Sequence, residues 1–159
     1  MIHPRRLRAA AFALAAAATL STPAAAAPAG CHGTPSDTWL NLRIEGLRNG
    51  NGLLTVALYP DNPRQFLAKG GTIKNNRFDA TGPVTRACIF VPKPGVYAIA
   101  VYHDEDSSRK LNRSALGLPT EGFGFSNNPA TVAGLPAFRS VRLNVPKTGL
   151  TTYIKMRYP

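Results

Sequence analysis

The amino-acid sequence predicts an all-β fold, a single antiparallel β-sandwich of about seven strands with one long loop between the fifth and sixth strands. Three observations lead to this prediction. Apolar and polar residues alternate in several short segments, glycines and prolines (14 of each) separate these segments, and no segment has a long apolar stripe at helical spacing. A chain of 159 residues is long enough for one such domain. A hydrophobic fraction of 44% excludes wholesale disorder.

The first 26 residues have the features of a secretory signal peptide. A basic start with three arginines precedes an apolar run over 9–20, and small residues lead up to Ala26. This run is shorter than the ~20 residues that span a bilayer, and no second hydrophobic run follows it. We therefore expect cleavage after Ala26, release into the periplasm or the medium, and a mature chain that does not span the membrane. An uncleaved anchor and a lipid attached at Cys31 remain alternatives.

Export changes the charge of the protein. Cleavage removes three of the 19 basic residues and none of the 8 acidic ones, so the formal net charge falls from +11 to +8. The remaining basic residues form no run and accompany no aromatic RNA-binding motif, so nucleic acid is not an expected partner. We expect a solvated basic surface and assign no specific partner. Anionic polymers of the cell envelope or another envelope protein are the alternative partners.

Export also bears on the two cysteines. In an oxidising compartment Cys31, within an N-terminal arm over 27–38, is expected to pair with Cys88 in the domain over 39–159. In the chain-entropy model, closing a loop of about 58 residues stabilises the fold by roughly 4 kcal/mol. A free reactive thiol is the alternative, although the flanking residues indicate no activated setting.

The first half of the domain predicts three strands. In 40–44, leucine and isoleucine alternate with polar residues, which is typical of a half-buried strand. The glycine- and asparagine-rich segment 48–52 predicts a turn, after which 53–59 is expected to pair with the first strand as a hairpin. One helical turn is expected within 60–71, and a weaker strand over 72–79.

The second half predicts four more strands. The segment 84–91 contains Cys88, and 96–103 is the most apolar segment of the domain. Near the end, 138–145 alternates, and 150–158 is expected to complete a final hairpin with it. The segment 104–137, between the fifth and sixth strands, predicts no strand of its own. A connection of this length in a compact domain is usually functional or internally packed.

Motifs in and around this long segment are similar to those of a known family. The bacterial domain of unknown function 2141 family has HDEN-x-NGKLDTN followed by G-x-P-x-EGYGFSNN. The matching residues here are His103, Asp104, Glu105, Lys110, Leu111, Gly117, Pro119 and the run from Glu121 to Asn128, with Phe123 in place of Tyr. The resemblance covers nearly the whole mature chain and implies an exported β-sandwich of the immunoglobulin-like or transthyretin-like kind. It implies no biochemical activity.

We expect residues 103–128 to form a binding or structural surface. The candidate ligand-binding residues are His103, Asp104, Asp106, Glu121, Phe123, Phe125, Ser126 and Asn127. The Gly-Phe-Gly-Phe run at 122–125 allows the two rings either to form a shallow binding ledge or to plug the end of the sandwich. We expect the plug, because a long loop must bury apolar surface to be ordered.

A calcium site is an alternative for the same segment. Oxygen-bearing residues stand at positions 1, 3, 5 and 9 of a calcium-loop spacing, namely Asp104, Asp106, Ser108 and Asn112. The usual glycine is replaced by Arg109, and no carboxylate stands at position 12, although Glu121 lies further along. We therefore expect no cofactor. We expect side-chain hydrogen bonds and the three cations of the loop, Arg109, Lys110 and Arg113, to pair with the acids; backbone amides or an ion are the alternatives.

Catalysis is not expected. The chain lacks G-x-S-x-G and H-E-x-x-H motifs, and Cys88 lies in a predicted strand instead of at a helix N-terminus. An enzyme centred on His103 and the neighbouring acids is the alternative. Adjacent residues of a strand point to opposite faces, so His103 and Asp104 are not expected to converge.

Overall fold

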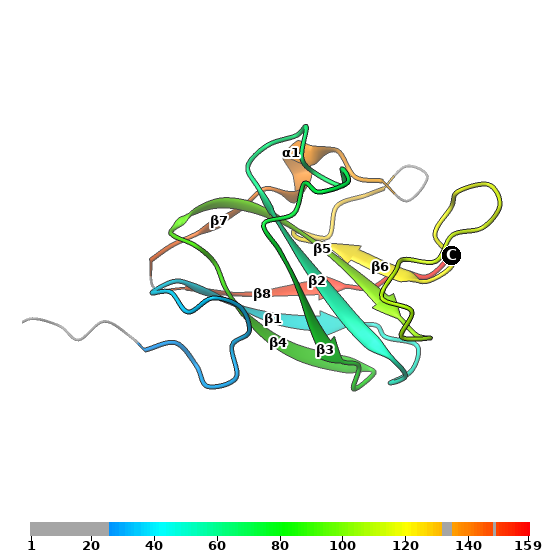
Figure 1. Cartoon of the computed structure of the whole chain (residues 1–159), viewed down its shortest axis with the longest axis horizontal. Helices are drawn as coiled ribbons and strands as arrows, with labels where there is room; N and C mark the ends of the chain where they lie inside the picture. Colours follow the sequence, from blue (N-terminus) through cyan, green and yellow to red (C-terminus); the bar gives the residue numbers. More distant parts are fainter. Residues whose placement is uncertain (1–25, 132–134, 148) are drawn as a thin grey trace, which may run out of the picture.

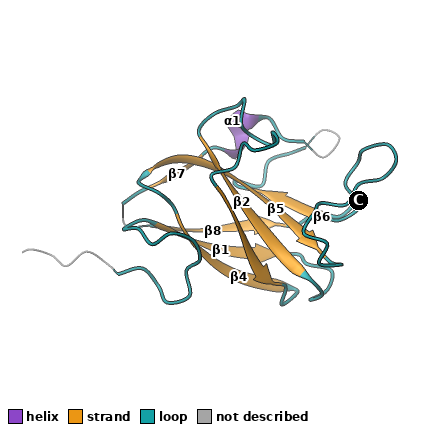
Figure 2. Ribbon diagram, viewed as in Figure 1, coloured by secondary structure: helices purple, strands orange, loops and turns teal. Residues whose placement is uncertain are grey.

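The computed structural model describes residues 26–131, 135–147 and 149–159. The signal peptide expected over 1–26 lies outside these residues, apart from Ala26. The described chain is an all-β protein whose strands form two sheets (Figure 1). Figure 2 shows how little of it is helical, since its helix is a single turn. None of the described helices is long and apolar enough to cross a membrane.

The smaller sheet has three strands in the order β4-β1-β8. Its strands are β1 (Trp39–Glu45), β4 (Val84–Phe90) and β8 (Leu150–Lys155). β1 is antiparallel to β4 but parallel to β8, with Leu40 opposite Leu150. The sheet is therefore mixed, and the prediction of a purely antiparallel sandwich is wrong.

The larger sheet has five strands. Four follow the order β3-β2-β5-β6, and β7 pairs with the beginning of β5. Its strands are β2 (Leu53–Pro60), β3 (Lys74–Asp79), β5 (Gly95–Asp104), β6 (Gly122–Phe125) and β7 (Leu143–Val145). The structure thus has eight strands where about seven were expected. The immunoglobulin-like or transthyretin-like type stays a prediction.

The expected hairpin between the first two strands is wrong. β1 and β2 lie in different sheets, and the intervening turn carries the chain from one sheet to the other. The physical reason is the burial of β2, whose residues 54–59 are all buried. A strand that is buried on both faces needs a central position in its sheet. Because β2 pairs with β3 along one edge and with β5 along the other, neither of its edges can pair with β1.

The expected final hairpin is also wrong. Within the predicted strand 138–145, the first part is the short helix α1 (Phe138–Val141). Phe138 and Val141, one helical turn apart, both pack against the outer face of the larger sheet. β7 then joins the larger sheet and β8 the smaller one. The segment 104–137, in which no strand was expected, contains β6.

The two sheets share one apolar core, which makes the arrangement sandwich-like. Leu40, Leu42 and Ile44 of β1 belong to the same buried cluster as Leu54, Val56 and Leu58 of β2. A second, smaller cluster lies on the opposite face of the larger sheet, where it includes Tyr59 and Phe125. That outer face is where the candidate site begins.

The predicted disulfide is present. Cys31 and Cys88 are joined, with their Cα atoms 4.3 Å apart. The arm runs beside β4, because the backbone of His32 donates to Cys88 (2.8 Å) and accepts from Phe90 (3.0 Å). The disulfide therefore fixes the N-terminal arm along the edge of the smaller sheet.

Candidate functional site

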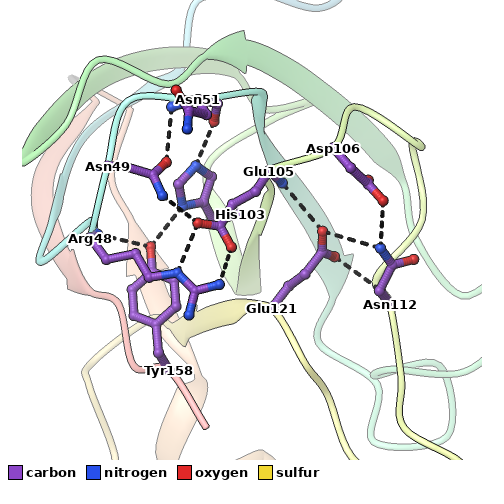
Figure 3. Close-up of polar contacts among 9 residues, drawn as sticks. All are labelled: Arg48, Asn49, Asn51, His103, Glu105, Asp106, Asn112, Glu121 and Tyr158. Carbon is purple, nitrogen blue, oxygen red and sulfur yellow. Dashed lines mark hydrogen bonds and ion pairs between the residues drawn. The ribbon is translucent and has the colours of Figure 1, made fainter.

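The end of β5 places its last three side chains on alternating faces of the larger sheet. Tyr102 faces outward, whereas His103 faces the space between the sheets and is fully buried. Asp104 is fully buried as well, where the strand passes into a loop. One strand end thus supplies both the polar network drawn in Figure 3 and one wall of an apolar groove.

His103 uses both of its ring nitrogens (Figure 3). Nε2 lies 2.7 Å from the carbonyl oxygen of Asn51, and Nδ1 lies 2.7 Å from the hydroxyl of Tyr158. A carbonyl only accepts, so Nε2 bears the proton and Nδ1 accepts from Tyr158. The Tyr158 oxygen in turn accepts from the Arg48 amide at 3.2 Å. His103 therefore ties the C-terminal segment to the β1–β2 turn.

Glu105 is held by the β1–β2 turn. The guanidinium of Arg48 binds both of its carboxylate oxygens, through Nε at 2.8 Å and through Nη2, and the Asn49 amide donates at 2.6 Å. These contacts, led by the hydrogen bond from Arg48, lower the pKa of the Glu105 carboxyl. The same guanidinium lies 4.6 Å from the centre of the Tyr158 ring. Glu105 is therefore part of the structural network.

Three other carboxylates converge beside this network. Oxygens of Asp104, Asp106 and Glu121 all lie within 4.8 Å of one another. Asp104 accepts from the amides of Ser108 (2.9 Å) and Arg109 (2.6 Å). Glu121, only 5% exposed, accepts from the amides of Glu105 (3.2 Å) and Asn112 (2.9 Å). We call Asp104, Asp106 and Glu121 the carboxylate cluster.

The expected pairing of these acids with the loop cations is wrong for the described chain. The side chains of Arg109, Lys110 and Arg113 are exposed and form no ion pair among the described residues. The loop backbone explains the difference, because Ser107 and Arg109 have positive φ (57° and 63°) and the loop amides turn toward the acids. Backbone amides thus replace the predicted cations.

The environment separates the pKa values of two cluster members. Burial raises the pKa of Glu121, and the charges of Asp104 and Asp106 raise it further. Hydrogen bonds from Ser108 and Asn112 lower the pKa of Asp106 to about 2. Asp106 is therefore ionised at neutral pH, whereas Glu121 holds a proton more readily than a free carboxyl does.

The residues of the calcium-loop spacing come together in part. Asp104 and Asp106 are in the cluster, and the Ser108 hydroxyl donates to Asp104 at 3.2 Å. The Asn112 amide donates to Asp106 at 2.8 Å. Glu121 completes the cluster although it is distant in sequence. It directly precedes β6, whose first residue, Gly122, pairs with His103 near the end of β5. This set of oxygens suits a hard divalent cation such as Ca²⁺.

The second feature of the site is a groove of about 700 Å³ on the outer face of the larger sheet. Its floor includes the small side chains of Ala57 and Ala100, which are cross-strand neighbours and leave room above them. Six aromatic residues line the groove, Tyr59, Phe66, Tyr102, Phe123, Phe125 and Phe138. Neighbouring rings of this set lie 5.3–6.1 Å apart between centroids. We call this the aromatic groove.

The Gly-Phe-Gly-Phe run explains one wall of the groove. In β6 the two phenylalanines face outward, level with Tyr102 and Ala100 of β5. The glycines face the C-terminal segment so closely that a Cβ at Gly124 would lie 2.7 Å from Ile154. The plug expected at the end of the sandwich is wrong, because both rings lie on the outer face and line the groove. Their position on the outer face agrees with the alternative in which the two rings form a shallow binding ledge.

Ser126 and Asn127, expected to contact a ligand, hold α1 in place instead. The Ser126 hydroxyl is buried and donates to the Val141 carbonyl, while it accepts from the Ile99 amide. The Asn127 amide donates to the carbonyls of Ser140 and Arg142 at 3.2 and 2.8 Å. Neither side chain lines the groove.

Three aromatic residues that line the groove from elements other than β5 and β6 were not predicted from the sequence. Tyr59, Phe66 and Phe138 come from β2, from the segment after it, and from α1. Alternation in 53–59 places Tyr59 and Ala57 on the same face, which was an available signal. Phe66 and Phe138 offered none, because their positions depend on how the connecting segments fold over the sheet.

Comparison with known proteins gives one match. A family model described as "Uncharacterized protein conserved in bacteria (DUF2141)" matches residues 42–153, which is most of the chain. It is the family that the motifs of the long segment indicated. Neither the curated proteins nor the solved structures contain a match.

Proposed function

The chain belongs to the DUF2141 family of uncharacterized bacterial proteins, and we propose that it is an exported, non-catalytic binding protein whose ligand occupies the aromatic groove. One observation carries this proposal. The groove has a volume of about 700 Å³ and gathers six aromatic side chains over a floor of alanines. Binding sites for small molecules have this size and composition.

Export is supported by the sequence and by the disulfide. The leader-like start predicts a signal peptide, and the Cys31–Cys88 bond is of a kind that persists in oxidising compartments. In this proposal the mature protein is a sandwich of the immunoglobulin-like or transthyretin-like type in the periplasm or the medium. Amino-terminal sequencing of the fractionated protein should give a start near Ala27, and a start at Met1 would contradict export.

A non-catalytic role is supported by the state of His103. Its two nitrogens are engaged by Asn51 and Tyr158, and its side chain is fully buried. A general base must reach the proton that it abstracts, and this imidazole faces only other parts of the chain. The charged part of the network likewise serves structure through the Arg48–Glu105 pair.

The aromatic groove can be tested with an uncharged fluorescent dye, Nile red. We expect the mature protein to bind it with enhanced fluorescence, and Phe123→Ala to lower the affinity severalfold because the half-buried ring forms a groove wall. Tyr153→Ala is the matched control, since this 57% exposed tyrosine lies on β8 in the other sheet. Circular dichroism checks that the variants are folded. Equal binding by all three proteins, or no binding, would contradict the proposal.

A second candidate function is binding of a divalent cation at the carboxylate cluster. The observation that favours it is the convergence of Asp104, Asp106 and Glu121 without an ion-pair partner for any of them among the described residues. Hard oxygen ligands of this kind suit Ca²⁺. In this reading the acidic side of the loop over 105–121 would serve as an ion site while its other side forms a wall of the groove.

Thermal unfolding tests this candidate. Millimolar calcium should raise the melting temperature, because a ligand bound only by the native state stabilises it by mass action. Asp106→Asn should abolish the rise, whereas Asp79→Asn, at an exposed position in β3, should retain it. An unchanged melting temperature in calcium would contradict cation binding and leave the amides as sufficient partners for the acids.

A further inference from the structure

We propose that the aromatic groove selects a single-chain anionic amphiphile, with a fatty carboxylate as the occupant. This inference rests on the proposed binding function and adds the chemical class of the ligand. It is argued from the charge of the groove, the position of that charge along the groove, and the apolar surface between its two ends.

The groove contains one charged side chain. Among the described residues that line it, Arg113 is charged, and none is a carboxylate. Arg113 comes from the loop over 105–121, whose acids Asp106 and Glu121 turn the other way into the carboxylate cluster. The loop therefore presents its negative charge on one side and a cation to the groove on the other. An anionic ligand group complements this arrangement.

Arg113 is held by its own loop. Its Nη1 donates to the carbonyl oxygen of Gly117 at 2.8 Å, and its backbone forms a bridge with Pro119. A guanidinium has five N–H donors, so one intramolecular bond leaves the others for a ligand. The planar fork of arginine matches the geometry of a carboxylate.

The segment over 61–72, which also contributes to the groove lining, has an excess of positive charge. The segment over 61–72 supplies Pro63, Phe66 and Leu67 to the groove. Arg64 and Lys69 of this segment form no ion pair among the described residues, whereas its one acid, Asp61, is bound by Arg142 at 2.6 Å. The free charges of this segment are therefore positive as well, although neither side chain lines the groove itself.

The body of the ligand must be apolar and extended. Tyr59 is opposite Ala98 in β5, four residues before Tyr102, so the two tyrosines stand about 13 Å apart along the sheet. Ala57 and Ala100 form the floor between them, and the phenylalanine rings form the sides. The Tyr102 hydroxyl donates to the Arg109 carbonyl at 3.4 Å, which places the loop of Arg113 at this end.

The ligand therefore lies along the strands with its head toward Arg113. Its chain covers the alanine floor and points toward Tyr59. Burial of methylene groups against the aromatic walls contributes about 0.8 kcal/mol for each group, which makes the chain the main source of affinity. The carboxylate contributes selectivity through the guanidinium. A neutral sugar is a poorer match, since few polar side chains line the groove.

The experiment compares the binding of three probes with the same alkyl chain, dodecanoate, dodecyl maltoside and dodecyltrimethylammonium, to the mature protein by displacement of Nile red. We expect dodecanoate to bind roughly tenfold more tightly than the neutral probe and the cationic probe to bind most weakly. Arg113→Gln should remove the preference for dodecanoate over dodecyl maltoside, and each affinity is calculated with the Nile red affinity measured for that variant. Arg113→Lys should restore part of the preference.

Arg86→Gln is the matched control for lost charge, because Arg86 is an exposed cation of β4 in the other sheet. It should leave all three affinities unchanged. If Nile red binds but dodecanoate shows no advantage over dodecyl maltoside, or if Arg113→Gln has no effect, the anionic-ligand inference is overturned while the groove remains a binding site. If neither Nile red nor any alkyl probe binds, the proposed function itself fails.

Discussion

Tyr158 connects three parts of the chain through a single oxygen atom. Its hydroxyl donates to Nδ1 of His103 and accepts from the Arg48 amide. In Tyr158→Phe, the buried Nδ1 would lose its donor, and an unsatisfied buried acceptor costs about 1–3 kcal/mol. We expect urea unfolding to show a loss of this size. Tyr153→Phe should change little, because Tyr153 is exposed and its hydroxyl forms no hydrogen bond among the described residues. Equal stability of the two variants would argue against the network.

Arg48 should make stability depend on pH. It lowers the pKa of Glu105 in the folded state, so the pair contributes stability above the ordinary carboxyl range. This contribution is lost as the pH falls through the lowered pKa. Arg48→Met should therefore have a lower urea midpoint than the wild type near pH 7, and the difference should shrink toward about pH 3. A difference that stays constant over this range would contradict the assignment.

At the scale of residues, the sequence indicated which acidic side chains belong to the site but not which groups they contact. Spacing identified Asp104 and Asp106, and Glu121 was noted as a residue that lies further along. Backbone amides were among the alternatives for their partners, but the sequence did not favour them over the cations, because their orientation depends on positive φ at Ser107 and Arg109. The structural role of His103 likewise depends on Asn51 and Tyr158, which are distant in sequence.

At the scale of elements, β6 depends on its two glycines. A Cβ at Gly124 would lie 2.7 Å from Cγ2 of Ile154 and 2.9 Å from the carbonyl oxygen of Lys155. Gly124→Ala should therefore push β6 away from the C-terminal segment and cost about 1–3 kcal/mol in the free energy of unfolding.

The matched control is Gly95→Ala at the beginning of β5. A Cβ there would lie 3.8 Å from the Tyr97 ring, its nearest neighbour among the described residues, which is ordinary contact. Because Phe123 and Phe125 alternate with these glycines, Gly124→Ala should also weaken Nile red binding. Unfolding midpoints that do not differ between the two variants would show that β6 tolerates displacement.

Strand positions were largely predictable, but strand partners were not. Alternation located the cores of β1, β2, β4 and β5 within a few residues. The pattern that predicts a strand does not state which sheet it joins, and both expected hairpins are wrong for this reason. The helix α1 was not predicted, because apolar and polar residues also alternate in this segment. The helical spacing of Phe138 and Val141 could therefore not be distinguished from a strand pattern.

At the scale of the whole molecule, the disulfide joins the N-terminal arm to the edge of the smaller sheet. Cys31 and Cys88 are separated by 57 positions. The doubly substituted Cys31→Ser, Cys88→Ser protein should lose roughly 4 kcal/mol in free energy of unfolding, because its unfolded chain is no longer closed into a loop. Denaturant titration measures this loss. A reductant should destabilise the wild type and leave the variant unchanged, and the opposite pattern would contradict the prediction.

The global architecture followed from the sequence only to the level of fold class. Period-two alternation indicated an all-β chain, and the two cysteines indicated their own pairing. The groove was not predictable, because its lining comes from β2, β3, β5, β6, α1 and three connecting segments. Such a surface exists only after the order of the strands has been fixed.

The parallel pairing of β1 with β8 has a consequence for the timing of folding. β1 is the first strand and the centre of its sheet, yet one neighbour, β8, is the last described strand to be synthesised. Contacts this distant in sequence give a high contact order and slow folding. A nascent chain must keep one edge of β1 open until its final segment emerges. In the proposed export, this delay would keep the chain unfolded until it has crossed the membrane.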